Sequence, residues 1–472
     1  MKLPSQDKEK SFHLFATLLA ISSLAHLSIH LPLISFSAEW ISGALVLLAA
    51  GWCLGRPQVK PLLTLAALQC VSVVLVAPYN PDHWLLLFFI NLIILVSALR
   101  LRLSEGEILP QRLMQQITPS ARLVFLVCYG FAALAKYNSD FLFSPNGAAQ
   151  ELFRLQVGAM PILKWLVWAP MVPWISIFCE SAIPLLLLHK RTRAIGVLIG
   201  VGFHTALILS PAVKVYDFTL MVISMLYLFT PDTFDAKIKA SICRLQDLMP
   251  GVFELVEQTK WQLAFAPTIA VLVISCWYPL LELPPRMSRL QGAVGLLVAI
   301  AIGLVLAKGL TGGLGQQSTV RWAPRSIFGW LVIAVALLNG FCPYLGLKTQ
   351  GSFTMFSSLR TEAGKWNHLI LPRTMQVVSS YQDKLVKIVE SNSDPINHAY
   401  VDRELLATEF EIHRTVATNP EISITLEKDG QQICINGRES MHSILGPPPS
   451  VLLRKLMVFR PVSPDGRNFL TN

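Results

Sequence analysis

Charged residues are scarce in this chain. Of its 472 residues, 14% are charged and 53% are hydrophobic, whereas a soluble protein carries about 25% charged residues. That balance excludes an ordinary soluble protein and is typical of a chain that crosses a lipid bilayer many times. The formal net charge of +10 fits Lys and Arg gathered in cytoplasmic loops, so it does not indicate nucleic-acid binding.

Linear catalytic and metal-binding motifs are also missing. The eight cysteines are scattered, with no Cys-x-x-Cys segment and no Cys/His spacing of the kind found in zinc sites, so we expect no metal site. There is no HExxH segment, phosphate loop, nucleotide fingerprint or Ser-His-Asp order. The glycine-rich segment "GLTGGLGQ", residues 309–316, is interpreted as a linker. Any chemistry must therefore come from residues that only the fold assembles.

Long apolar runs are what the sequence has in abundance. Roughly 20 apolar residues cross a bilayer as a helix, and we predict about nine to eleven spans. They lie near residues 12–33, 40–55, 61–78, 83–99, 121–137, 168–188, 194–210, 215–231, 261–281, 291–308 and 326–345. The first run follows three lysines, so it is either an uncleaved first helix or a cleaved signal peptide.

The connections between these runs alternate in positive charge. Those that follow the even-numbered spans are rich in Lys and Arg, as in "HKRTR" at residues 189–193, and those that follow the odd-numbered spans are poorer. The weakest case is the connection at 282–290, which carries Arg286 and Arg289. The positive-inside rule then places the N-terminus in the cytoplasm and the tail, from residue 346, outside it.

The tail divides into two parts. Residues 346–373 mix aromatic and polar side chains and are predicted to form an ordered loop against the membrane face. Residues 374–472 have soluble composition: Leu385, Ile388 and Val389 show helical spacing, and "EKDGQQ" predicts a hairpin that turns at Asp429-Gly430. The predicted fold is an all-α polytopic membrane domain, residues 1–345, followed by the loop and a small extracytoplasmic α+β domain.

Ionisable residues within the spans gather toward the tail-facing side. His26, His30, His83, Lys136, His204, Tyr216 and Asp217 lie near the outer ends of spans, and Glu180 and Asn91 lie deeper. Because charge in hydrocarbon is costly, this convergence predicts an outward-facing polar pocket. A lysine among apolar side chains can lose its proton and act as a general base.

Each of these residues also has a purely structural interpretation. Lys136 can extend its ammonium group to lipid headgroups. His26, His30 and His204 can be satisfied by hydrogen bonds between helices, and Glu180 can pair with a neighbouring hydroxyl or cation.

The segment "LVCYGFAALAKYNSDF", residues 126–141, resembles the Y-x-x-A-G-x-x-K-L segment of the HTTM superfamily, whose best-known member is the vitamin K-dependent gamma-glutamyl carboxylase. The stretch at 179–231, with its "FH" pair at 203–204, and the helix start "PDHWLLLFF" at 81–89 follow the same family's pattern. The tail is far smaller than the carboxylase's lumenal domain and looks more like that of bacterial HTTM proteins. The resemblance covers roughly residues 15–370 and is most convincing over residues 80–232.

The resemblance implies an enzyme in a bacterial plasma membrane. Lys136 would be the catalytic base, assisted by His83 and His204, with a reduced quinone such as vitamin K as cofactor. Glu180, Tyr216, Asp217 and Asn91 would line the pocket for an extracytoplasmic peptide or small-molecule substrate.

Two other functions stay open. One is a non-catalytic maturation or immunity factor that binds a secreted peptide. The other is a transporter, against which stands the lack of paired hydropathy repeats.

Overall fold

The computed structural model describes residues 11–30, 37–159, 169–208, 215–231, 233–281, 285–310, 322–362, 364–378, 380–428 and 430–464. Several predicted features lie outside these residues: the ends of three spans at 31–33, 168 and 209–210, the linker from 311, Asp429 of the hairpin turn, and the tail from 465.

The chain is mostly helical, as predicted, and each of the eleven apolar runs falls on a helix. These helices are α1 (Phe12–His30), α2 (Ala38–Gly55), α3 (Val59–Val76), α4 (Asp82–Glu105), α5 (Pro110–Ala135), α8 (Val172–Leu188), α9 (Arg193–Leu207), α10 (Tyr216–Tyr227), α12 (Pro250–Leu281), α13 (Pro285–Leu310) and α14 (Ile327–Leu345). Three further helices, which the sequence did not predict, are α6 (Ser139–Phe143), α7 (Ala148–Ala159) and α11 (Phe234–Leu248).

Not all of these helices have the length of a membrane span. Among the described residues, six helices are long and apolar enough to cross a membrane, namely α1 to α5 and α14. The helices α8, α9 and α10 are apolar but have only 17, 15 and 12 residues, fewer than the roughly 20 that cross a bilayer. They pack beside the long helices and supply walls of the site described below.

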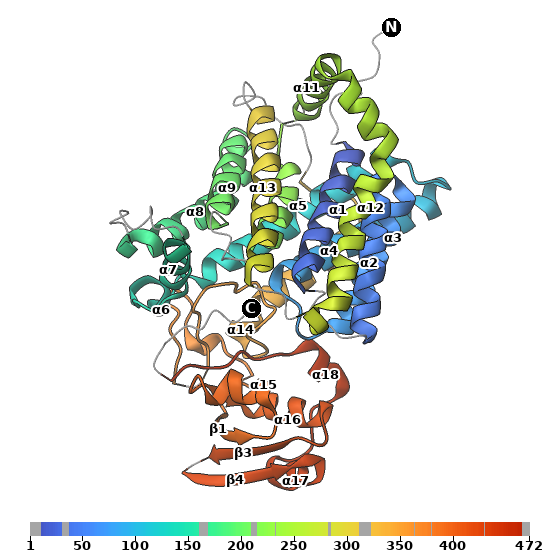
Figure 1. Ribbon diagram of the computed structural model, residues 1–472. Helices are drawn as coiled ribbons and strands as arrows, with labels where there is room; N and C mark the ends of the chain where they lie inside the picture. Colours follow the sequence, from blue (N-terminus) through green and yellow to red (C-terminus); the bar gives the residue numbers. More distant parts are fainter. Residues whose placement is uncertain are drawn as a thin grey trace.

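The helices form one bundle (Figure 1). Helices α1 to α5 pack in sequence order, α10 lies against α1, and α14 lies against α5. The contact between α14 and α5 is close at Gly340, where an added Cβ would lie 2.2 Å from the Phe131 ring. Small residues of this kind let two helices approach closely. In a bilayer, helix association depends on such close packing, because lipid tails are as apolar as the helix surfaces.

The tail carries a small antiparallel sheet at the end of the bundle away from α11 (Figure 1). Its strands are β1 (Leu385–Ser391), β2 (Leu406–Thr408), β3 (Ser423–Lys428) and β4 (Gln431–Asn436), in the order β2-β1-β3-β4. The short helices around it are η5 (Arg373–Met375), α15 (Asp394–Ile396), η6 (Asn397–Val401), α16 (Glu409–Thr418), α17 (Gly437–Leu445) and α18 (Val451–Leu456); one further turn, η4 (Ala169–Met171), precedes α8 in the bundle.

One tail prediction is confirmed and another is wrong. Strands β3 and β4 form the predicted hairpin, with Lys428 opposite Gln431 and Gly430 at a φ of +77°. The segment that starts at Leu385, however, is strand β1 and not a helix. Val386 and Ile388 point into the tail core while Lys387 between them is exposed. Burial therefore alternates every two residues, as in a strand, and pairing with β3 overrides the weaker helical spacing.

Candidate functional site

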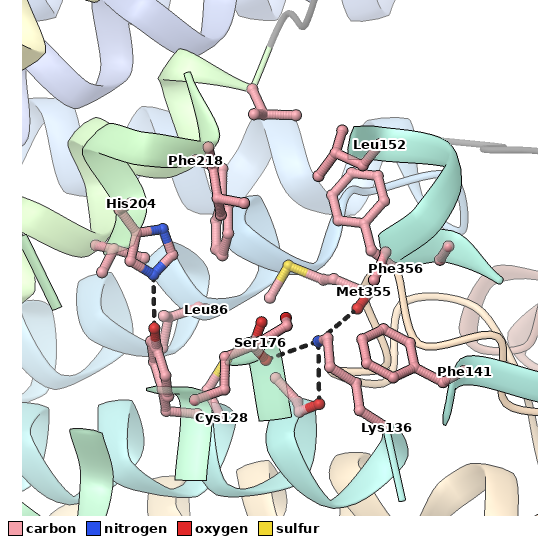
Figure 2. A pocket seen from close by; sticks show the side chains of 18 of the residues that line it. Leu86, Cys128, Lys136, Phe141, Leu152, Ser176, His204, Phe218, Met355 and Phe356 are labelled. Carbon is pink, nitrogen blue, oxygen red and sulfur yellow. Dashed lines mark hydrogen bonds and ion pairs between the residues drawn. The ribbon is translucent and has the colours of Figure 1, made fainter. Parts of the chain in front are cut away.

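A pocket lies between helices α5 to α10 and the loop that follows α14 (Figure 2). Most of its lining is apolar, and the strongly polar side chains on it are Tyr129, Lys136, Ser176, Glu180 and His204. The side chains leave about 50 Å³ in which the centre of a water molecule can move. An enclosed, mostly apolar space with a few converging polar groups has the character of a ligand or active site.

Lys136 ends α5 and points into the pocket, where it is only 4% exposed. Its Nζ lies 2.7 Å from Glu180 Oε2 and donates to the carbonyls of Ala132, at 3.2 Å, and Met355, at 3.0 Å. All three donors of an ammonium group are therefore satisfied. The ammonium group of Lys136 therefore does not extend to the lipid headgroups. It is buried in the pocket and paired with Glu180.

Glu180, on α8, supplies the countercharge. It is 8% exposed and also accepts a hydrogen bond from Ser176, one turn earlier on the same helix. A buried charge needs a partner of the opposite sign, because the desolvation cost is otherwise several kcal/mol. Lys136 and Glu180 thus form one electrostatic unit with one side on the pocket.

A second polar pair stands on another wall of the pocket. The hydroxyl of Tyr129 lies 2.6 Å from His204 Nε2, and His204 is 1% exposed. His204 Nδ1 has no hydrogen-bond partner among the residues that the structure describes. Tyr129 was not predicted, although it occupies the first position of the Y-x-x-A-G-x-x-K-L resemblance. The signal that could have identified Tyr129 is its position two turns before Lys136 on the same helix.

The loop after α14 closes the pocket with Met355 and Phe356. Three of its residues, Phe353, Phe356 and Ser358, have φ values of 61°, 48° and 56°, a left-handed conformation that residues other than glycine rarely adopt. Such strain persists only where surrounding contacts impose it, and it concentrates at functional sites.

Polar anchors from the helix ends hold this loop. The carboxylate of Asp82, at the start of α4, accepts hydrogen bonds from the backbone nitrogens of Phe353, at 2.7 Å, and Thr354, at 3.1 Å. Asn138, just after α5, donates to Ser357 O at 2.6 Å. The loop is therefore attached both to the helix that bears Lys136 and to α4.

His368 is a further anchor of the loop. Its Nε2 donates to Leu134 O at 2.9 Å, while Nδ1 accepts from the backbone nitrogens of Leu371, at 2.8 Å, and Ile370, at 3.1 Å. Both ring nitrogens of the neutral imidazole are therefore used in hydrogen bonds. A proton added at Nδ1 would face the two N–H groups that now donate to it, which disfavours the charged ring. Burial lowers the pKa of His368 below its usual value.

We therefore expect His368 to make the protein less stable in mild acid. The unfolded chain takes up a proton as the pH falls below about 6.5, whereas the folded chain does so only at a lower pH, so stability is lost across that window. In His368→Asn, whose Oδ1 can still accept from Leu371, the slope of unfolding free energy against pH should fall by up to about 1.4 kcal/mol per pH unit. Thermal unfolding between pH 7.5 and 5 measures this, and equal slopes in both proteins would contradict it.

The other predicted catalytic histidine, His83, is not among the residues that line the pocket. Its Nε2 lies 2.8 Å from Asp217 Oδ2 on α10, and the same oxygen lies 3.1 Å from His26 Nδ1 and 3.3 Å from His30 Nε2. The ring of Phe218 is close to both histidines: its centroid lies 5.9 Å from that of His83 and 5.0 Å from that of His204. Of the predicted site residues, Lys136, Glu180 and His204 thus line the pocket, whereas His83 and Asp217 belong to a neighbouring cluster.

Two further predicted residues take part in helix packing. The Tyr216 hydroxyl bonds to that of Ser28 at 2.8 Å and joins α10 to α1. Asn91 donates to Gln69 Oε1 at 2.7 Å, which joins α4 to α3. Neither is among the residues that line the pocket.

Comparisons with family models, curated proteins and solved structures give no match to this chain. The geometry of the pocket and the sequence resemblance are therefore the grounds on which a function can be argued.

Proposed function

We propose that this chain is a multi-pass membrane enzyme of the HTTM type, in which Lys136 and Glu180 move a proton to or from a substrate bound in the pocket. The observation that carries the proposal is the buried ion pair, 2.7 Å between Nζ and Oε2, with one side on a mostly apolar cavity. General bases and acids are found in such water-poor sites because burial brings their charged and neutral forms close in free energy.

The two residues would act together. A lysine ammonium group is not a base until it loses a proton, and the Glu180 carboxylate is within hydrogen-bond distance to receive it. The transfer leaves two neutral groups, whose burial costs less than that of two ions. The free amine of Lys136 then takes a proton from the substrate, and the Tyr129–His204 pair offers a second hydrogen-bonding group in the same pocket.

The mostly apolar lining of the pocket, which includes Met355 and Phe356, suits a lipophilic substrate. A reduced quinone such as vitamin K is the cofactor that the resemblance implies. The proposal is proton transfer by Lys136, on a lipophilic or peptide substrate.

The proposed setting is a bacterial plasma membrane, with the N-terminus in the cytoplasm and the tail outside it. Six helices of sufficient length and apolarity support a lipid environment, and the alternation of Lys and Arg in the connections supports the orientation. In this orientation the pocket, closed by the loop next to the tail, faces the extracytoplasmic side.

Deuterium transfer in heavy water tests the assignment of the base. Membranes from cells that naturally make the protein would be incubated in D₂O, and extracted lipids, small molecules and peptides would be analysed by mass spectrometry. We expect at least one molecule to gain deuterium with the wild type and with Lys387→Ala, which replaces an exposed lysine of β1, and not with Lys136→Met/Glu180→Gln.

Labelling that survives in the double variant, or its absence with the wild type, would remove the catalytic role. A phenotype that tolerates the double variant but not tail substitutions would favour the peptide-binding factor instead.

A further inference from the structure

The cluster beside the pocket has the composition of a metal site. His26 and His30 lie four residues apart on one face of α1, His83 is the second residue of α4, and Asp217 is the second residue of α10. One nitrogen from each histidine and one carboxylate oxygen all lie within 4.8 Å of one another. Three imidazoles and a carboxylate form a donor set that suits zinc and neighbouring divalent transition metals.

The distances leave little adjustment to be made. In a tetrahedral zinc site the ligand atoms, about 2.0–2.2 Å from the metal, lie about 3.3 Å from one another. Here Asp217 Oδ2 lies 2.8, 3.1 and 3.3 Å from the nitrogens of His83, His26 and His30. All four donor atoms lie within 4.8 Å of one another, so side-chain adjustments at the three helix ends would bring them around one ion.

Hydrogen bonding alone accounts poorly for these contacts. His26 Nδ1 and His83 Nε2 lie 3.0 Å from each other, and both lie within hydrogen-bond distance of Asp217 Oδ2. If both carry protons, two N–H groups converge at close range. If one does not, its lone pair faces the carboxylate oxygen. A cation at the centre removes both conflicts, because it needs lone pairs from every ligand.

Neighbouring groups hold the side chains of this cluster in fixed orientations. Asp217 Oδ1 accepts a hydrogen bond from Phe218 N at 2.7 Å, which holds the carboxylate with Oδ2 toward the histidines. The His26 ring stacks on Trp84, with centroids 3.8 Å apart and planes 15° apart. His26, His83 and Asp217 are all buried, and His30 is partly exposed. Fixed ring orientation is a recurrent property of ligating histidines.

We propose that His26, His30, His83 and Asp217 bind a divalent transition-metal ion that joins α1, α4 and α10. Four protein ligands complete a tetrahedral zinc shell, which is the pattern of a structural site and not of a catalytic one with an open position. The ion would stabilise two parts of the pocket wall. Asp217 directly precedes Phe218, which lines the pocket. His83 directly follows Asp82, which anchors the strained loop. The proposal goes beyond the proton-transfer function and does not depend on it.

Metal binding to the full-length protein tests this directly. The protein, purified in detergent and stripped with a chelator, would be dialysed against Zn²⁺ and its metal content measured by mass spectrometry. Co²⁺ would serve as a spectroscopic probe, because a tetrahedral nitrogen–oxygen site produces intense visible bands. We expect one Zn²⁺ per chain in the wild type and in His13→Ala, which removes an exposed histidine of the same helix.

His30→Ala and Asp217→Asn are expected to weaken Zn²⁺ binding by about tenfold or more and to abolish the tetrahedral Co²⁺ spectrum. His30 is the most exposed of the four, so its variant should fold, and gel filtration checks this. A folded wild type that binds no stoichiometric Zn²⁺ or Co²⁺ would overturn the proposal. So would affinities that are unchanged by both substitutions. Neither result bears on the Lys136 assay, so the two proposals can fail separately.

Discussion

Lys136→Met is expected to destabilise the protein strongly, and the added substitution Glu180→Gln is expected to restore most of the loss. The single variant leaves the Glu180 carboxylate buried without its cation, and breaking a buried ion pair in this way costs about 3–5 kcal/mol. The double variant replaces both charges by neutral side chains of similar size. Replacement of a whole buried pair by neutral residues is often close to neutral for stability.

Thermal unfolding in detergent, followed by intrinsic fluorescence, measures this recovery. The matched control is Lys387→Met, at a lysine whose only described ion pair is a surface contact of 3.8 Å to Glu427, where the change should be within about 1 kcal/mol. If the single and double variants unfold at the same temperature, the two side chains are not coupled. That result would also remove Glu180 as the proton acceptor for Lys136.

Arg414→Met is expected to detach the tail from the bundle. Arg414 forms a buried ion pair with Glu411 one turn earlier on α16, and its guanidinium group lies 4.6 Å from the centre of the Tyr79 ring, in the connection between α3 and α4. Glu411 also accepts from Phe459 N at 2.8 Å. The substitution leaves Glu411 buried and unpaired, at a cost of about 3–5 kcal/mol, and removes the contact with Tyr79.

Limited proteolysis together with thermal unfolding separates these effects. We expect faster cleavage between α14 and β1 in Arg414→Met, and a smaller loss of stability in Arg414→Met/Glu411→Gln, since the neutral amide can still accept from Phe459. Arg373→Met is the control, because Arg373 is exposed and its ion pair among the described residues, with Asp383, is a surface contact of 3.4 Å. Equal cleavage of Arg414→Met and Arg373→Met would show that Arg414 does not hold the tail.

The sequence alone determined the apolar helices, the hairpin of the tail and the end of the spans near which polar groups gather. Apolar runs predict helices because a helix satisfies its own backbone hydrogen bonds, and all eleven runs are helical. Asp429-Gly430 between alternating strands predicted the hairpin, because a two-residue turn restricts the backbone to few conformations. Alternating topology placed His26, His83, Lys136 and Asp217 near the same end, since depth along a span follows from position in the sequence.

Only the tertiary structure decided which of these groups meet. Position in a span gives depth but not the rotation of one helix against its neighbours, which is set by side-chain packing between helices. That packing directs Lys136 toward Glu180 and His83 toward Asp217. Likewise, β1 became a strand because its partners β2 and β3, distant in sequence, supply the hydrogen bonds. Both outcomes depend on contacts between segments that are far apart in the chain, which a local pattern does not encode.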